Sequence, residues 1–133
     1  MGAMKTKRTQ RTDPRATRRR FLLALRELDE AWVETFHKSG FGDVYFSRLF
    51  TELWLRDSVA VSKTDACDLV KGVSRQTAMK YVNKAIADGF LSEADNPADG
   101  RSRLLRMTPL LREQFARVID RANAAFLAVL NQE

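Results

Sequence analysis

The sequence predicts a mainly α fold arranged as a winged helix-turn-helix. Two short helices over 62–88 flank a tight turn at Gly72-Val73. A hairpin follows, because two apolar strand segments lie on either side of the turn-forming stretch 96–100. Longer helices with single apolar stripes precede and follow this unit. This order of elements is typical of proteins that place one helix end and one loop against neighbouring grooves of a duplex.

The first long helix is expected from Asp13 to about Lys38. Asp13 is a good helix cap, and Pro14 suits the first helical position, where an N–H would have no partner. Gly40 is suited to the left-handed residue that ends the helix. The apolar positions are spaced four, three, four and four residues apart, which makes one stripe of Phe21, Leu25, Leu28, Trp32 and Phe36.

The second helix is expected from Asp43, as its cap, to about Arg56. Its apolar residues cover more than one face, so it is predicted to be the central and most buried element. Residues 59–61 then form a short extended segment.

The helix-turn-helix begins at Ser62, which caps the first short helix with Asp65 in the return position. Ala66, Leu69 and Val70 are expected to face inward. Ser74 caps the second short helix, which runs to about Asp88 before Gly89 ends it. Its inward stripe is expected to be Ala78, Val82, Ala85 and Ile86.

The wing and the last helix follow from two further patterns. The return strand 102–107 alternates, with Leu105 and Met107 on the same side. Thr108-Pro109 starts a final helix, which carries a seam typical of coiled coils at Leu111, Phe115, Val118, Ala122, Ala125 and Val129.

Four segments are therefore predicted: a basic disordered arm at 1–12, amino-terminal helices at 13–58, the winged unit at 59–108 and a carboxyl-terminal helix at 109–133. A small winged unit has little surface to cover both terminal stripes, which favours a homodimer over an intramolecular core. The interface residues expected are Phe21, Leu25, Leu28, Trp32, Leu111, Phe115, Val118, Ala122, Phe126 and Val129.

Charge and composition bound the function. The net charge is +6 and the isoelectric point is near 9.9, but residues 1–20 hold eight of the 23 Lys and Arg and only one acid. The rest of the chain has 15 basic and 16 acidic residues, so the first 20 residues set the global charge. One cysteine, one histidine and no phosphate-binding glycine loop argue against a metal site, a cofactor or catalysis. No apolar stretch is long enough for a membrane span, and we expect a cytoplasmic protein.

The second short helix carries the chemistry of groove recognition on its outward face. Arg75, Gln76 and Thr77 occupy its first turn, where Arg suits guanine, Gln suits adenine and Thr suits thymine or phosphate. Lys80 and Lys84 are one turn apart, as for contacts with phosphates. The backbone N–H groups at the Ser74 end offer a further phosphate site. At the wing, Arg101 and Arg103 are expected to reach a minor groove.

The segments VSRQTAMKYVNKAIADGFL and DNPADGRSRLLRMTP resemble the MarR-type transcriptional regulators over about 50 residues. The resemblance implies that Ser74, Arg75, Gln76, Thr77 and Lys80 meet the major groove and that Arg101 meets the minor groove. It also implies a dimer through the terminal helices and allows a small-molecule effector. The chain departs from the family pattern at Pro109-Leu110-Leu111 and in ending at Glu133, which leaves the dimer geometry open.

The sequence therefore predicts a sequence-specific regulator that binds double-stranded DNA and is not an enzyme. Two alternatives remain open at this point: a winged-helix module that binds a protein and no DNA, and a plasmid replication or partition factor. Tyr81 fits either a phosphate contact or a place at the edge of the core.

Overall fold

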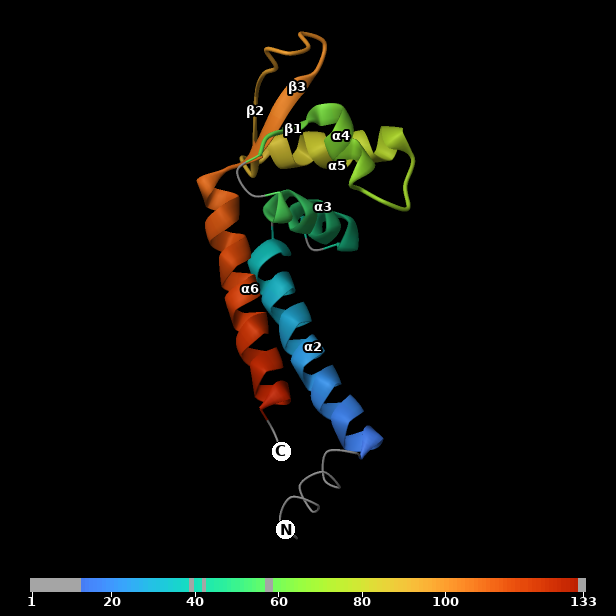
Figure 1. Cartoon of the computed structure of the whole chain (residues 1–133), viewed down its shortest axis with the longest axis vertical. Coiled ribbons are helices and arrows are strands. Elements are labelled where there is room, and N and C mark those ends of the chain that lie inside the picture. Colours follow the sequence, from blue (N-terminus) through green and yellow to red (C-terminus); the bar gives the residue numbers. More distant parts are fainter. Residues whose placement is uncertain (1–12, 39, 42, 57–58, 132–133) are drawn as a thin grey trace. The chain divides into compact units, whose positions relative to one another are not determined.

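The computed structural model describes residues 13–38, 40–41, 43–56 and 59–131 (Figure 1). The elements are α2 (Pro14–Phe36), α3 (Val44–Leu55), β1 (Val61–Ser62), α4 (Lys63–Asp68), α5 (Arg75–Ala87), β2 (Leu91–Asp95), β3 (Arg103–Met107) and α6 (Pro109–Leu130). This confirms the predicted mainly α fold with a small hairpin. The predicted basic arm at 1–12 lies outside the described residues.

The helix boundaries follow from local capping. The Asp13 carboxylate accepts a hydrogen bond from the Arg15 N–H at 3.1 Å, and the Asp43 carboxylate accepts from the Tyr45 and Phe46 N–H groups at the start of α3. These bonds satisfy amide donors that have no partner within the helix. Gly40, after α2, has a φ of 80°, the left-handed conformation expected of a helix-ending glycine.

Contacts divide the chain into two units, and the division differs from the predicted segments. Unit 1 comprises the chain up to Thr35 together with the chain from Arg117 onward, and unit 2 comprises Phe36–Ala116. The second helix, α3, therefore belongs with the winged elements, as do the first two turns of α6. The reason is packing: Phe50 and Trp54 of α3 both stack against Phe115 of α6.

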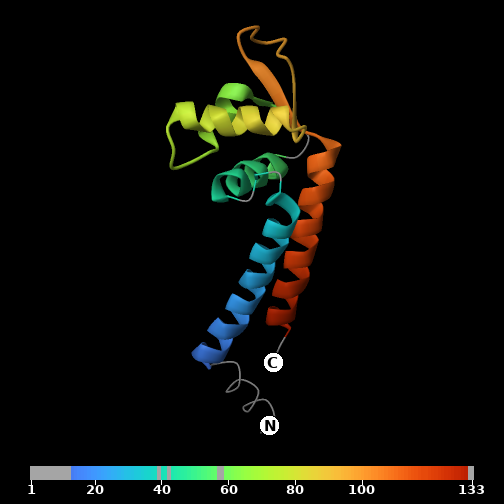
Figure 2. The same cartoon turned by 180° about the vertical axis from the view of Figure 1, so that it is seen from behind.

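Unit 2 is built on a three-stranded antiparallel sheet with the order β1-β3-β2. Val61 pairs with Leu105, and Leu91 pairs with Met107, so that these four side chains are all buried. Figures 1 and 2 show α5 beside α4 and α3, with the hairpin extending from the end of α5 at which the chain enters β2. The sheet thereby fixes the wing to the carboxyl end of α5.

The core of unit 2 is an aromatic cluster. The cluster consists of Phe36, Phe41, Phe46, Phe50 and Phe90. Their rings are in tilted or edge-to-face contact, with centroids 4.3–6.0 Å apart. Such contacts stabilise the fold beyond the gain from burying apolar surface. Phe50 is completely buried, and the predicted central position of α3 is confirmed by its four buried residues, Phe46, Leu49, Phe50 and Leu53.

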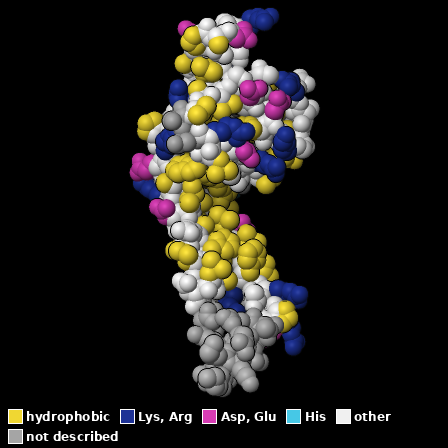
Figure 3. Space-filling view, viewed as in Figure 1, with side chains coloured by type: hydrophobic (Ala, Val, Ile, Leu, Met, Phe, Trp, Pro, Cys, Tyr) yellow, Lys and Arg dark blue, Asp and Glu magenta, His cyan; other side chains and the backbone are white. Residues whose placement is uncertain are grey.

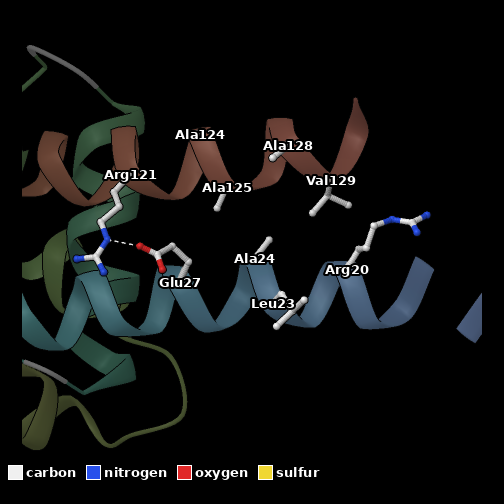
Figure 4. Close-up of a pocket in the computed structure, with 9 residues that line it drawn as sticks. All are labelled: Arg20, Leu23, Ala24, Glu27, Arg121, Ala124, Ala125, Ala128 and Val129. Atoms are coloured by element: carbon white, nitrogen blue, oxygen red, sulfur yellow. Dashed lines mark hydrogen bonds and ion pairs between the residues drawn. The ribbon is translucent and has the colours of Figure 1, made fainter. Parts of the chain in front are cut away.

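Unit 1 is an antiparallel pair formed by α2 and the later part of α6. Phe21 stacks on Phe126 with centroids 5.5 Å apart, and the Arg121 guanidinium donates hydrogen bonds to Glu27 and Glu34. These two carboxylates, Glu34 first, raise the pKa of Arg121 above its ordinary value. An open groove of about 540 Å³ lies between the helices, and Figure 4 shows its small-residue wall of Ala124, Ala125 and Ala128 on α6.

The predicted dimer residues fall into two groups. Trp32, Leu111, Phe115, Val118 and Ala122 are at most 8% exposed within the single chain, so little of their surface is left for a second copy. The others, Phe21, Leu25, Leu28, Phe126 and Val129, are exposed or half-buried. Figure 3 shows hydrophobic side chains gathered over the two helices of unit 1. Leu22, Leu23 and Leu127, which belong to these helices, are exposed. The dimer therefore stays a prediction, and these exposed residues are its candidates.

Among the described residues, no helix is both long enough and apolar enough to span a bilayer.

Candidate nucleic-acid interface

The amino end of α5 is capped as the sequence predicts. The Ser74 hydroxyl oxygen accepts a hydrogen bond from the Thr77 N–H at 3.1 Å. Ala78, Val82 and Ala85 are buried and anchor the helix, while Arg75, Gln76, Lys80 and Lys84 are exposed. Because the Ser74 cap satisfies one amide of the first turn, other N–H groups there stay available to an anion. The first turn thus presents donors to solvent.

Arg75 is exposed but paired. Its Nη2 donates a hydrogen bond to Asp68 Oδ1 at 2.9 Å, and the two side chains are 60% and 57% exposed. Asp68 is the last residue of α4, so this bond spans the turn between the two short helices. An exposed pair of this kind is worth at most about 1 kcal/mol, so Arg75 remains free to leave it for another acceptor.

The two lysines of α5 differ in their surroundings. Lys80 is exposed and forms no ion pair with any residue that the structure describes. Lys84 pairs with Asp88 at 2.9 Å, and its ammonium lies 4.7 Å from the centroid of the Phe41 ring. Lys84 is thus engaged at the carboxyl half of α5, beside the turn that follows α2, whereas Lys80 is available for a phosphate.

The wing tip is shaped by two side-chain turns. The Asn96 side-chain oxygen accepts from the Ala98 N–H, and the Asp99 carboxylate accepts from the Arg101 N–H, each at 3.0 Å. Arg101 itself is 94% exposed, with its Nε 3.5 Å from Asp99. The loop therefore holds the backbone of Arg101 while leaving its guanidinium in solvent.

Arg103, the other predicted wing residue, is held along the hairpin. Its Nε lies 3.2 Å from Glu93 Oε1, and it also forms an ion pair with Asp95, the residue opposite it in the strand register. Glu93 lies 3.7 Å from Lys63 of α4 as well. Arg103 thus braces the stem of the wing, and the structure places only Arg101 at the tip.

The amino end of α5 and the wing tip are spatially separate. Figures 1 and 2 show the hairpin rising near the carboxyl end of α5, with the first turn at the other end of the helix. Neither of the two arginines is folded inward. The arrangement offers two cationic contacts from one compact unit, as a duplex with neighbouring grooves would need.

Tyr81 lies at the edge of the core. Its hydroxyl donates a hydrogen bond to Asp43 Oδ2 at 2.8 Å, while its ring stacks on Phe46 and Tyr45 at 4.6 and 5.4 Å. Asp43 also caps α3, so one carboxylate ties the start of α3 to the back of α5. Desolvation, followed by the hydrogen bond to Asp43, raises the pKa of Tyr81 to about 12.

This shift predicts an alkaline transition. Because the folded chain holds the Tyr81 proton more tightly than the unfolded chain, the associated stability is complete below pH ~10 and is lost as the pH rises to about 12. Absorbance titration of the tyrosines should show one ionisation near pH 12. It should disappear in Tyr81→Phe, and its persistence in that variant would contradict the assignment.

Several partners were not predicted from sequence. Asp68, Glu93 and Asp95 engage Arg75 and Arg103 from other elements, and Asp43 meets Tyr81 across 38 positions. Thr108 also does more than start a helix, since its hydroxyl donates to the Gly89 carbonyl at 2.7 Å. Asp95 and Arg103 are opposite each other in the hairpin, so their pairing follows from the strand register. The pairs of Asp68 with Arg75 and of Asp43 with Tyr81 follow no helical or strand spacing, so periodicity could not predict them.

The described residues contain no group of three or more His, Cys, Asp or Glu that could hold a metal ion. Cys67 is buried, and its thiol lies 3.8 Å from the sulfur of Met79. Desolvation raises the pKa of this thiol, which keeps it protonated and unreactive. Cys67 is therefore a small packed residue of the core.

Comparison with known sequences finds neither a matching family model nor a matching curated protein. Comparison with solved structures does find similar folds. A transcriptional regulator from Thermotoga maritima is 23% identical with a TM-score of 0.57, over 82% of this chain and 77% of that one. A MarR family transcriptional regulator from Streptomyces coelicolor, solved in complex with DNA, is 16% identical with a TM-score of 0.57, over 86% and 71%.

A mutant MarR from Escherichia coli, solved with operator DNA, is also similar, at 12% identity and a TM-score of 0.56 over 84% of this chain and 77% of that one. At these identities the likeness concerns the fold. It confirms the winged-helix fold of MarR-type proteins that the wing and helix motifs predict.

Proposed function

We propose that the chain is a sequence-specific double-stranded DNA-binding transcriptional regulator of the MarR type. The observation that carries the proposal is the exposed first turn of α5, which presents Arg75 and Gln76 beside a capped helix end. The proposal is supported by the fold, since structures with the same fold were solved with DNA bound. Within the described part of the winged unit, no comparable feature supports the alternative of a protein-binding winged helix.

In this proposal α5 enters the major groove with its amino end. Arg75 would donate two hydrogen bonds to guanine, and Gln76 would pair with adenine, since these are the edges that their side chains fit. Arg101, almost wholly exposed at the wing tip, would enter the minor groove alongside. Arg103 is then a bracing residue of the wing, and the Ser74 end of α5 supplies backbone N–H groups to a phosphate.

The affinity would come largely from phosphates. Lys71 and Lys80 are exposed and belong to a stretch from Lys71 to Ile86 that holds four basic residues and no acid. Each phosphate neutralised by such a residue makes binding more sensitive to salt, with a slope of about 0.9 per contact. Lys84 contributes less in this proposal than its spacing from Lys80 suggests, because Asp88 already pairs with it.

Titration of the purified chain against fluorescent genomic fragments, with competitor DNA and a salt series, tests this function. The proposal expects some fragments to stay bound at competitor concentrations that remove the rest. An exposed arginine of α3 supplies the control: Arg48→Ala should leave the retained fragments unchanged. Uniform release of every fragment, or no binding at low salt, would overturn the proposal.

We further propose that unit 1 pairs with a second copy. Phe21, Leu22, Leu23, Leu127 and Leu130 are 41–73% exposed, and Leu23 also lines the groove between α2 and α6. Exposed apolar surface gathered over two helices is typical of an interaction site. Arg121 lies at one end of this groove (Figure 4). Its guanidinium is already hydrogen-bonded to Glu27 and Glu34, so covering the groove would not leave this charge unpaired. A small-molecule effector stays a prediction.

Leu23→Asp is expected to halve the mass in solution. Burying a carboxylate in an apolar interface costs several kcal/mol, which is enough to dissociate most dimers. The folded monomer should tolerate the change, because the position is exposed there. Sedimentation or light scattering measures the mass. Val44→Asp makes the same change at a 69% exposed residue of unit 2 and should keep the dimer. A wild-type chain that is monomeric at micromolar concentration would refute the pairing.

A further inference from the structure

The turn between α4 and α5 brings a carboxylate against Arg75, the first residue of α5. Asp68 ends α4, Arg75 begins α5, and their side chains meet at 2.9 Å although both are more than half exposed. Their neighbours Ala66 and Ala78 are buried, which fixes the two helices from which the pair projects. The position of the carboxylate beside Arg75 is therefore set by the core of the helix-turn-helix.

The contact leaves most of the guanidinium unoccupied. Arg has five N–H donors, and Asp68 accepts from one nitrogen, Nη2. A guanine edge offers two acceptors, O6 and N7, that a guanidinium can satisfy with its remaining donors. Arg75 can thus meet a base while Asp68 still contacts it. The pairing also restrains a long side chain that would otherwise lose more rotamer freedom on binding.

A phosphate meets a different situation. It carries a full negative charge, so bringing one to Arg75 also brings it close to the Asp68 carboxylate, and like charges at such distances repel. The stretch from Lys71 to Ile86 contains no acid, so Asp68 is the carboxylate that acts on the leading cation of α5. Its neighbour on α4, Asp65, is also exposed but forms no ion pair with Arg75.

We infer that Asp68 is a specificity-determining residue: it holds Arg75 for a base edge and opposes its use as a non-specific phosphate contact. This inference rests on the proposed DNA-binding function and adds a residue that touches no DNA itself. The pair contributes little to folding, because exposed ion pairs are worth at most about 1 kcal/mol. Its effect is on the ratio of specific to non-specific affinity.

Asp68→Asn tests the inference, since it removes the charge and keeps the size of the side chain. We expect the affinity for non-specific duplex to rise about three- to fivefold, and the affinity for the preferred site to change less. The ratio of specific to non-specific affinity should therefore fall by a similar factor. Asp65→Asn changes the net charge equally on the same helix and should leave the ratio unchanged. Thermal unfolding should be the same for both variants, which separates the effect from a structural one.

The Arg75→Ala background completes the test. If Asp68 acts through Arg75, Asp68→Asn should have no further effect on the ratio when Arg75 is absent. An unchanged ratio in Asp68→Asn, an equal fall in Asp65→Asn, or a full effect without Arg75 would each overturn the inference while leaving the DNA-binding function intact. A wild-type chain that binds all duplexes equally would instead overturn the function, and the inference with it.

Discussion

Arg75→Ala is expected to lower discrimination between the preferred site and a site with the contacted guanine replaced by about 1–3 kcal/mol, or roughly fivefold to over a hundredfold. The loss arises because alanine cannot donate to O6 and N7. Affinity for unrelated duplex should fall much less, since one cation is lost among several. Anisotropy titrations on sites substituted at each base pair measure both quantities.

Lys80→Ala is the matched comparison for this prediction. Lys80 lies five residues further along α5, is also exposed and is assigned to a phosphate. Its loss should therefore weaken all duplexes alike and reduce the salt slope by about one contact. The same loss of base preference in both variants would contradict the roles given to the two residues. A uniform weakening by Arg75→Ala would show that Arg75 binds only phosphate.

Phe50→Ala is expected to destabilise the protein by about 3–5 kcal/mol. Phe50 is fully buried and its ring meets Phe36, Phe41, Phe46, Phe90 and Phe115, so its removal opens a cavity at the centre of unit 2. The total free energy of unfolding of a domain is only about 5–15 kcal/mol, so much of the variant would unfold on modest warming. Chemical denaturation followed by circular dichroism gives the value.

Leu55→Ala on the same helix is the control for Phe50→Ala. Leu55 is 71% exposed, so its truncation should change the free energy of unfolding by no more than about 0.5 kcal/mol. DNA binding by Phe50→Ala should fall in proportion to the unfolded fraction, because the cluster positions α5 through Phe90 without lying at the interface. A cost below 1 kcal/mol for Phe50→Ala would contradict the assignment of α3 as the central element.

The elements could be predicted because their ends are set by neighbours in sequence. Asp43, Ser62 and Ser74 each accept from an N–H two or three residues ahead, so that residue type and spacing alone mark the start of a helix. Gly40 and Gly89 end helices with positive φ values of 80° and 83° for an equally local reason. The alternation of β3 likewise predicts that Leu105 and Met107 share a face, and the structure buries both.

The pairing of charged side chains could not be predicted in the same way. The partners of Arg75, Arg103 and Tyr81 come from other elements of the fold, so the sequence near each residue does not identify them. Lys84 has the spacing of a phosphate contact, yet Asp88 and the Phe41 ring hold it. The boundaries between the two units could not be predicted from the apolar spacing either. They fall within α2 and α6, and the apolar stripes of these helices continue across them.

The central claim is that α5 and the wing read a duplex, and selection from a pool of random duplexes by the purified chain tests it most directly. Sequencing of the retained DNA should give two inverted half-sites about ten base pairs apart from centre to centre, with a guanine in each half-site whose enrichment disappears for Arg75→Ala. A retained pool with the same base frequencies as the starting pool would contradict the account.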